Sequence, residues 1–453
     1  MPLPPAPLST GAIASSGILL RPEIPLCQTD LPLDWYQAEF KPYAQEYLAL
    51  PDRTPATILP WLDRYALPAL DHFGPALLLL AHFYMGGEIV KLVERYGGKV
   101  ADSYALALQA ARNPEKSVIV ESAVHFMAET IATLALPHQQ VYITNPKAGC
   151  TMEMLAKEHL VAPVVEQLLE RYGSELAVVA YMNTSGRIKA LAGSTGGAVC
   201  TSSNAHHVVE AVLRTHRKVL FVPDRHLGRN TANRLGLARS AVVALPDAPL
   251  FRSDLSLRNP AIPGGLAALD GARMILWGSY CGVHTVFRPE HVDWWHARGW
   301  RVLVHPECPE EVVARADGSG STDYLWKAVA SAERGARIAI GTEGHFVRNA
   351  REQAARRGVE VMHLADIPDP AFASGGCGCA TMSRNDPPHL AGMLDLLRRG
   401  RPPEINRVLA GDVVDEITGS RERLCEAERQ VLIADARRAL ERMIEITESA
   451  ARG

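Results

Sequence analysis

Cysteine thiols are the most chemically versatile side chains in this sequence, and their spacing is unusual. Cys150, Cys281 and the pair Cys377 and Cys379 lie in separate thirds of the chain, each beside a glycine. Widely separated cysteines are typical of a cofactor held where several substructures meet, whereas compact metal fingers take their ligands from close pairs. An iron–sulfur cluster held by only three thiolates would leave one iron open to a substrate, and would therefore be a catalyst rather than only an electron carrier.

Other chemically capable residues follow most of the short apolar runs of the chain. Ser, Thr and Asn at such positions are often plain helix N-caps, and for any single one this is the simpler interpretation. The clusters also contain His, Tyr, Glu and Cys, which capping does not require, so their recurrence predicts a shared site. The clusters are His82 with Tyr84, Asp102 with Ser103, Asn145 with Cys150, and residues 181–185, 200–205, 223–228, 305–308, 320–322 and 341–344.

Two alternating kinds of segment must position these residues. Continuous apolar runs rich in Val, Ile and Leu predict parallel strands covered on both faces, and the helical stretches between them indicate βαβ units. So many strands would be unusual in one sheet, and several small sheets fit better. Ligands bind such sheets beyond the carboxyl ends of the strands, where the polar clusters stand. The predicted strands are residues 76–83, 117–122, 140–144, 176–182, 198–201, 219–222, 274–277, 301–304, 337–341 and 359–364, and the predicted helices include 89–96, 104–111, 126–136, 152–172, 205–215, 289–298 and 323–334.

Length and composition limit the class of protein. A chain of 453 residues exceeds the size of one hydrophobic core, so about two to three domains are expected. The chain is 47% hydrophobic and 21% charged with a net charge of −3, so it lacks the basic footprint of a nucleic-acid-binding protein. The longest apolar stretch, residues 75–83, is too short to span a membrane. Eight cysteines without a disulfide framework, and no recognisable secretion signal, predict a cytoplasmic location.

Taken in order along the chain, these motifs resemble those of the quinolinate synthase family. The resemblance runs from about residue 77 to the last helix and is weakest before residue 70. The family makes quinolinate, the precursor of the nicotinamide ring, by condensing iminoaspartate with dihydroxyacetone phosphate, with loss of phosphate and water. The segments that carry the resemblance are residues 82–84, 102–103, 125–130, 148–150, 181–183, 201–205, 223–228, 281–284, 305–308, 320–322 and 341–344.

The resemblance implies an α/β fold of three similar three-layer αβα domains, with short parallel sheets around a pseudo-threefold axis. A [4Fe–4S] cluster would lie at the centre, held by one cysteine from each domain, and its open iron would act as a Lewis acid. The protein would be a transferase that forms a C–C bond in de novo NAD biosynthesis. Its partners would be the two small-molecule substrates, and the enzyme that supplies iminoaspartate is a further candidate partner.

The motifs also imply which cysteines bind the cluster. The implied ligands are Cys150, Cys281 and Cys379. Cys379 is chosen over Cys377 because the four residues that begin at Cys379 match the family's Cys-x-x-Met pattern, and Asn385 stands at the usual distance after that methionine. Cys377 would then be a spare thiol or a redox partner of Cys379.

Some residues near these motifs have a simpler interpretation. Pro387 and Pro388 depart from the family pattern. Cys200 and Cys308 adjoin site motifs, yet most buried cysteines are small hydrophobic residues, and we expect the same here. A structural zinc on the three ligand cysteines is a weaker alternative, because structural zinc normally takes a fourth protein ligand.

Both substrates are anions, so the site needs hydroxyl, amide and imidazole donors together with helix N-termini. His125 is a further candidate, with capping of the following helix as the alternative, and Glu343 and His345 are expected to line either the site or an interface. By resemblance, the substrate-binding residues are His82, Ser103, Asn183, Ser202 and Thr322, with His305 as a further donor. The candidates for general acid–base catalysis are Glu307, His305, Tyr84 and Tyr181.

The predicted domain organisation follows the cysteines. Residues 1–70 would be an extension whose aromatic residues Trp35, Tyr36, Tyr47 and Trp61 pack on the core. Apolar residues at helical spacing in 420–450 predict a terminal helix that packs back on the body, with a dimer contact as an alternative. The predicted units are 71–149 completed by 380–453, then 150–278 with an insertion near 239–271, and finally 279–379.

Two other functions compete with a quinolinate synthase. The first is another [4Fe–4S] hydro-lyase, such as an enzyme of the aconitase kind, which also leaves one iron open. Such enzymes pair two ligands closely in sequence, and Cys150 and Cys281 do not follow that spacing. The second is a non-enzymatic iron–sulfur sensor, which would not need His, Tyr and Glu at successive strand ends.

Overall fold

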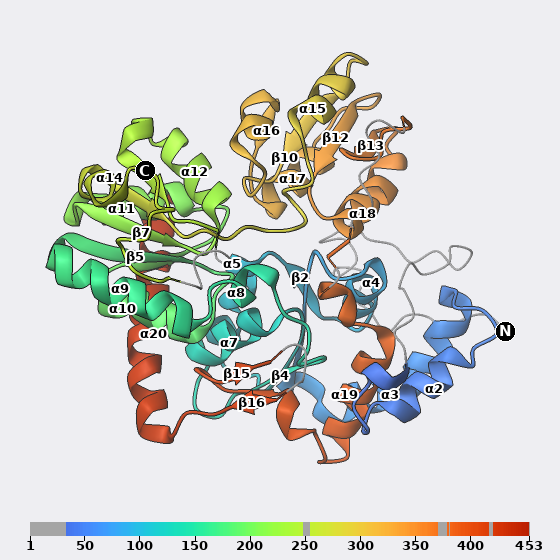
Figure 1. Ribbon diagram of the computed structural model, residues 1–453. Helices are drawn as coiled ribbons and strands as arrows, with labels where there is room; N and C mark the ends of the chain where they lie inside the picture. Colours follow the sequence, from blue (N-terminus) through green and yellow to red (C-terminus); the bar gives the residue numbers. More distant parts are fainter. Residues whose placement is uncertain (1–32, 248–253, 370–377, 380, 416–419, 453) are drawn as a thin grey trace.

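The computed structural model describes residues 33–247, 254–369, 378–379, 381–415 and 420–452. Within them, three α/β lobes, each built on its own sheet, meet at the centre of the molecule (Figure 1). Cys377 and the first 32 residues of the predicted extension lie outside the described residues. Among the described helices, none combines the length and apolar character that a membrane crossing would require.

The sheet of the first lobe has the order β14-β4-β3-β1-β2. Its first four strands in sequence run parallel, whereas β14 pairs antiparallel with β4 and comes from the C-terminal part of the chain. All six residues of β1 are buried, as expected for a leucine-rich parallel strand covered on both faces. The strands are β1 Leu77–His82, β2 Lys99–Ala101, β3 Val118–Ser122, β4 Gln140–Ile143 and β14 Arg407–Val408.

The other two lobes repeat this arrangement. The second sheet has the order β6-β5-β7-β9-β8 and the third has β11-β10-β12-β13, and all their strands are parallel. Each lobe therefore places its second strand beside its first and its third on the other side. The predicted α/β fold with several short parallel sheets is confirmed. The strands are β5 Leu176–Tyr181, β6 Ala198–Cys200, β7 Lys218–Val222, β8 Val242–Ala244, β9 Met274–Leu276, β10 Arg301–Val304, β11 Gly318–Ser319, β12 Arg337–Gly341 and β13 Glu360–His363.

Helices cover the faces of these sheets, and two of the predicted helices are interrupted. Residues 152–172 form α8 and α9 rather than one helix, because the carbonyl of Leu155 accepts a hydrogen bond from Trp277 Nε1 and Lys157 is extended. Residues 104–111 similarly divide into α5 and α6. The helices of the lobes are α4 Gly87–Arg95, α5 Ser103–Ala107, α6 Gln109–Arg112, α7 His125–Leu134, α8 Thr151–Met154, α9 Glu158–Tyr172, α10 Gly186–Ser194, α11 Ala205–Thr215, α12 Arg225–Arg234, α14 Gly265–Gly271, α15 Pro289–His296, α16 Glu310–Arg315, α17 Thr322–Ala330 and α18 Gly344–Ala355.

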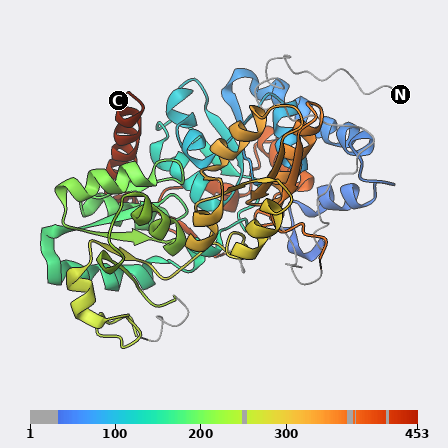
Figure 2. The same cartoon turned by 90° about the horizontal axis from the view of Figure 1, so that it is seen from above.

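Both ends of the described chain pack against the lobes. The helix α20 (Glu426–Arg452) lies along α10 of the second lobe (Figures 1 and 2). Its Leu440 and Met443 side chains are buried. Its predicted apolar face is partly wrong, because the Val431 side chain is 66% exposed. At the other end, α2 (Lys41–Leu48) and α3 (Pro55–Phe73) pack against α19 (Pro387–Arg398).

Aromatic residues of the N-terminal extension pack largely as predicted. Tyr36, Tyr47 and Trp61 are buried, whereas Trp35 is 54% exposed. The antiparallel pair β15 (Val413–Val414) and β16 (Arg421–Glu422) was not predicted, because two-residue strands leave no periodic pattern. The domain boundaries themselves stay a prediction.

Candidate active site

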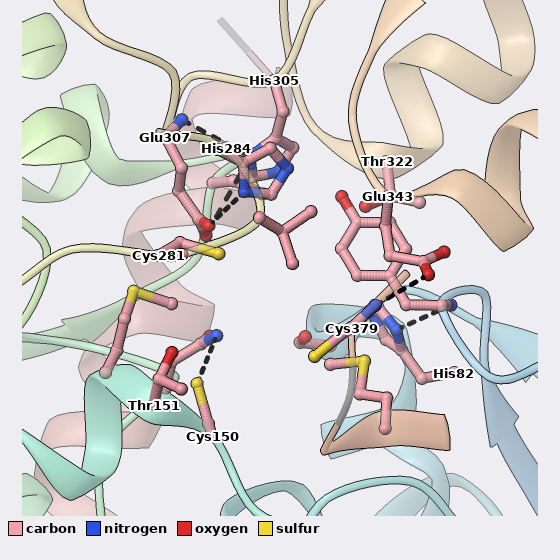
Figure 3. A pocket seen from close by; sticks show the side chains of 18 of the residues that line it. His82, Cys150, Thr151, Cys281, His284, His305, Glu307, Thr322, Glu343 and Cys379 are labelled. Carbon is pink, nitrogen blue, oxygen red and sulfur yellow. Dashed lines mark hydrogen bonds and ion pairs between the residues drawn. The ribbon is translucent and has the colours of Figure 1, made fainter. Parts of the chain in front are cut away.

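A cavity of about 350 Å³ lies where the three lobes meet. Its wall contains every residue predicted for metal binding, substrate binding or catalysis. Figure 3 labels some of them, among them the three cysteines and Glu307. They come together because the parallel strands of each sheet end at this centre, so the loops that follow them face one another. The predicted residues on the wall are Cys150, Cys281, Cys379, His82, Ser103, Asn183, Ser202, Thr322, Tyr84, Tyr181, His305 and Glu307.

Three thiols point into the same open space from three different segments (Figure 3). Burial raises the pKa of Cys150, Cys281 and Cys379, and each of the first two is also raised by the neighbouring thiols. No Lys or Arg stands among the described residues of the wall. A bound metal would supply the missing positive charge and displace the thiol protons, because thiolate is the form that binds metals. Three converging soft donors without a cationic partner fit an iron–sulfur cluster.

Backbone and side-chain contacts fix each cysteine. Asp224 caps α12 with one carboxylate oxygen and accepts a hydrogen bond from the backbone N–H of Cys281 with the other, at 3.1 Å. Gly278, three residues earlier, passes so close to the neighbouring chain that a Cβ there would lie 1.8 Å from the carbonyl oxygen of Pro246. Glu343 accepts a hydrogen bond from the backbone N–H of Cys379 at 3.2 Å. Cys150 directly precedes α8.

Glu307 is the centre of a buried polar network. Tyr181 donates its hydroxyl hydrogen to Glu307 Oε1 at 2.5 Å, and His284 Nδ1 lies 2.8 Å from Oε2. Burial alone would raise the pKa of Glu307, but His284 beside it and the hydrogen bond from Tyr181 hold it below its ordinary value. Burial and the Glu307 charge raise the pKa of Tyr181 well above its ordinary value, so Tyr181 remains a donor. The carboxylate is therefore ionised and oriented by two lobes.

This network continues to the first lobe through two residues to which the sequence assigned no role. Thr342 Oγ1 lies 3.1 Å from His284 Nε2 and 2.7 Å from the hydroxyl oxygen of Tyr84. Close polar contacts thus join Tyr84 to Glu307 through Thr342 and His284. His284 had a sequence signal, because it stands three residues after Cys281. In the sequence, Thr342 looks like an ordinary helix-capping residue after a strand. Only the packing of the lobes brings it to Tyr84.

Histidines at strand ends share one local geometry. Nδ1 of His82 accepts a hydrogen bond from the backbone N–H of Tyr84 at 3.1 Å. Nδ1 of His305 accepts one from the backbone N–H of Glu307 at 3.4 Å. Burial lowers the pKa of both rings to about 3, so they are neutral near pH 7. Since Nδ1 is the acceptor, the ring proton resides on Nε2. Each ring can therefore offer one N–H donor without bringing a full charge into the cavity.

Other predicted residues stand at helix starts around the cavity. Ser103 is the first residue of α5, and Thr322 is the first residue of α17, whose N-cap is Ser321. Asn183 follows β5, with Nδ2 3.9 Å from the sulfur of Cys150. Because no Lys or Arg stands among the described wall residues, hydroxyls, amides, imidazoles and backbone N–H groups must bind an anionic ligand here.

A second buried carboxylate supports the Asn183 loop from behind. Glu129 accepts hydrogen bonds from the backbone N–H groups of Gly186 and Gly411, both at 2.7 Å. A Cβ on Gly186 would lie 2.5 Å from Glu129 Oε1, so this contact requires glycine. Lys189 donates to the carbonyl of Thr184 at 2.5 Å. These contacts tie α7 and α10 together beside the loop that carries Asn183.

Of the remaining candidates, Glu343 lines the cavity and three others do not. Glu343 lines it and accepts a hydrogen bond from His345 Nδ1 at 2.7 Å. His125, Cys200 and Cys308 are buried but are not part of the cavity wall. The alternative that His125 caps a helix is wrong, because His125 is the first residue of α7 and Val124 is its N-cap.

Comparisons with known proteins agree on one family. Residues 75–445 match the family model described as Quinolinate synthetase A protein. The quinolinate synthase of Corynebacterium glutamicum is 36% identical over 395 residues, which cover 86% of this chain and 88% of that protein. That of Streptomyces coelicolor is 38% identical and covers 83% and 91%, and that of Acidobacterium capsulatum is 37% identical and covers 81% and 91%.

Proposed function

Because the chain belongs to the quinolinate synthase family, we propose that it condenses iminoaspartate with dihydroxyacetone phosphate to form quinolinate, with loss of phosphate and water. The enzyme would be a transferase of de novo NAD biosynthesis, acting in the cytoplasm. The observation that carries this proposal is the single cavity at the centre of three lobes, lined by three cysteine thiols and by the Glu307 network.

Cys150, Cys281 and Cys379 would hold a [4Fe–4S] cluster. When bound, the cluster would supply an open iron that polarises the substrate and assists dehydration. The fit rests on the donor set: one buried and two half-buried cysteine thiols face one space, and no Lys or Arg stands among the described residues of the wall.

The remaining residues would bind the anionic substrates and move protons. Ser103, Asn183, Ser202 and Thr322 offer neutral donors to carboxylate and phosphate oxygens. Neutral donors in a buried cavity form strong hydrogen bonds to anions because water competes little there. His82 and His305 would add their Nε2 protons to this set.

Glu307 would be the general base of the reaction. Its carboxylate is ionised and held by Tyr181 and His284, so it can accept a proton from substrate carbon. The proton can then leave through His284 to Thr342 and Tyr84, which are already joined by hydrogen bonds. Tyr84 lines the same cavity, where it can return a proton to a departing oxygen.

Anaerobic purification followed by a synthesis assay tests this function. We expect a brown protein with about four iron and four sulfide per chain, which forms quinolinate from oxaloacetate-derived iminoaspartate and the triose phosphate. Cys150→Ala, Cys281→Ala and Cys379→Ala should each lose the cluster and the activity, whereas Cys200→Ala should keep both. A colourless, folded protein that binds tetrahedral zinc would contradict the proposal.

The same assay separates the alternatives. A hydro-lyase would contain iron and dehydrate a hydroxy acid without forming quinolinate, and a sensor would contain the cluster but turn over neither substrate. The family match does not favour either of them. Iron that survives in Cys379→Ala but not in Cys377→Ala would transfer the third ligand to Cys377.

A further inference from the structure

Two parts of the chain that carry no chemical motif pack against each other. The first is the segment of residues 33–73, here called the brace, which precedes the family-matched region 75–445. The second is the start of α19, where Pro387 and Pro388 depart from the family pattern. Helices α2 and α3 of the brace, drawn in blue, lie beside α19, drawn in orange-red (Figure 1).

A buried polar contact joins the brace to the first turn of α19. The hydroxyl of Tyr36 donates to the carboxylate of Asp386, which also accepts from His389 Nδ1 at 2.6 Å. Asp386 caps α19 by accepting a hydrogen bond from the backbone N–H of His389 at 3.0 Å. The rings of Tyr36 and His389 stack with centroids 4.8 Å apart. All three side chains are at most 4% exposed, so water contributes little to satisfying this carboxylate.

The apolar part of the contact is equally specific. A Cβ on Gly392 would lie 2.6 Å from the ring of Phe40 and 3.0 Å from that of Tyr43, so α19 needs glycine where the brace crosses it. One turn further, the hydroxyl of Tyr43 donates to Asp395 at 2.7 Å. The brace thus holds α19 at two carboxylates and one glycine.

Asn385, the residue before Asp386, links the start of α19 to the wall of the cavity. Asn385 is fully buried; its Nδ2 donates to the carbonyl of Ala123 at 2.9 Å, and its Oδ1 accepts from Thr144 at 2.7 Å. Its backbone N–H donates to the carbonyl of Met382, which lines the cavity. Cys379 lies only three residues before Met382.

We propose that the brace positions the third cysteine, with Tyr36 as a positioning residue that acts through Asp386 and Asn385 on the segment of Cys379. This inference rests on the proposed function, because the group that Cys379 would hold is the cluster. It gives the brace a task that its sequence does not reveal. Without the Tyr36 contact, the start of α19 and the segment before it should open more often.

Iron release from the intact holoenzyme tests the proposal. We expect Tyr36→Phe to keep the ring packing but release iron to a ferrous chelator roughly three- to tenfold faster, the effect of losing one hydrogen bond to a buried carboxylate. Tyr65→Phe is the matched control, because the Tyr65 hydroxyl donates to Glu46 within the brace. Equal release rates in wild type, Tyr36→Phe and Tyr65→Phe would overturn the proposal.

Hydrogen exchange in the metal-free chain gives a readout that does not need the cluster. The amide of Asn385 should exchange faster in Tyr36→Phe than in wild type or Tyr65→Phe, while amides of β5 stay unchanged. If wild type binds no cluster but this difference appears, the proposed cofactor fails and the positioning survives. Unchanged exchange at Asn385 would overturn the positioning even in a functional quinolinate synthase.

Discussion

Two buried glutamates in different lobes differ in whether their carboxyl groups have polar partners. Glu307 follows β10 of the third lobe, and Glu121 lies within β3 of the first lobe, between Leu80 of β1 and Ile143 of β4. Both side chains are almost inaccessible to solvent. Glu307 contacts Tyr181 and His284, whereas neither carboxyl oxygen of Glu121 has a hydrogen-bond partner among the described residues.

The pKa of a buried glutamate is therefore raised in one lobe and lowered in the other. Burial raises the pKa of Glu121 to about 8 because nothing opposes it. At Glu307 the partners outweigh burial and hold the pKa below its ordinary value. Glu307 lies at a strand end, where groups from another lobe can reach it, while Glu121 lies one residue inside its strand, on the face of Ile119. Burial alone keeps the Glu121 carboxyl protonated, whereas the partners that gather where the lobes converge keep Glu307 ionised.

The largest expected effect comes from removing the charge of Glu307. Glu307→Gln keeps the shape but cannot accept a proton, so we expect kcat to fall roughly 100- to 10,000-fold. Iron content should not change, because Glu307 is not a proposed ligand. Steady-state kinetics together with iron analysis on the same anaerobic sample would measure both.

Glu121→Gln is the matched control for that change. It removes a buried glutamate charge from a neighbouring lobe and should leave kcat within about twofold of wild type. If both variants lost activity equally, burial of the carboxylate would matter more than its partners, and the comparison between the lobes would fail.

An intermediate effect is expected on the pH dependence of stability at Glu121. The folded chain keeps this proton up to about pH 8, whereas the unfolded chain releases it near the ordinary value of 4.5. The folded state thus binds more protons between these values, and the free energy of unfolding falls as pH rises. Wild type should lose roughly 2–3 kcal/mol between pH 5 and pH 7 that Glu121→Gln does not lose.

Urea unfolding at several pH values would measure this difference. Glu360→Gln is a suitable control, because Glu360 is an exposed glutamate at the start of β13. Parallel pH profiles for wild type and both variants would show that Glu121 is not held protonated by burial.

The sequence predicted the strand ends better than the contacts between lobes. Residues such as His82, Tyr181 and His305 follow long apolar runs, so their places at the sheet edges were predictable. The strands β2, β8 and β11 were missed because they are two- or three-residue edge strands, and β2 is only partly buried. Such strands depend on pairing with a neighbour rather than on their own apolar pattern.

Contacts between residues that are distant in sequence produce no recognisable local sequence pattern. Glu121 stands in an apolar run and gave no sign that it would lack partners, and Tyr36 gave no sign that it would reach Asp386. The break between α8 and α9 was missed for the same reason, since the contact from Trp277 is made where α8 ends. Local chemistry was predictable wherever one segment determines it, and was not predictable where two distant segments meet.

The smallest expected effect tests the link that Thr342 provides between Tyr84 and His284. Thr342→Val removes the hydroxyl that bridges them and keeps the side-chain shape, so kcat should fall roughly three- to tenfold, as for one lost hydrogen bond. Thr342→Ser restores the hydroxyl and should recover most of this loss. Because Glu307 keeps its contacts with Tyr181 and His284 in this variant, the loss of kcat must stay well below that of Glu307→Gln. Full activity in Thr342→Val would instead show that proton transfer involves only the third lobe and Tyr181.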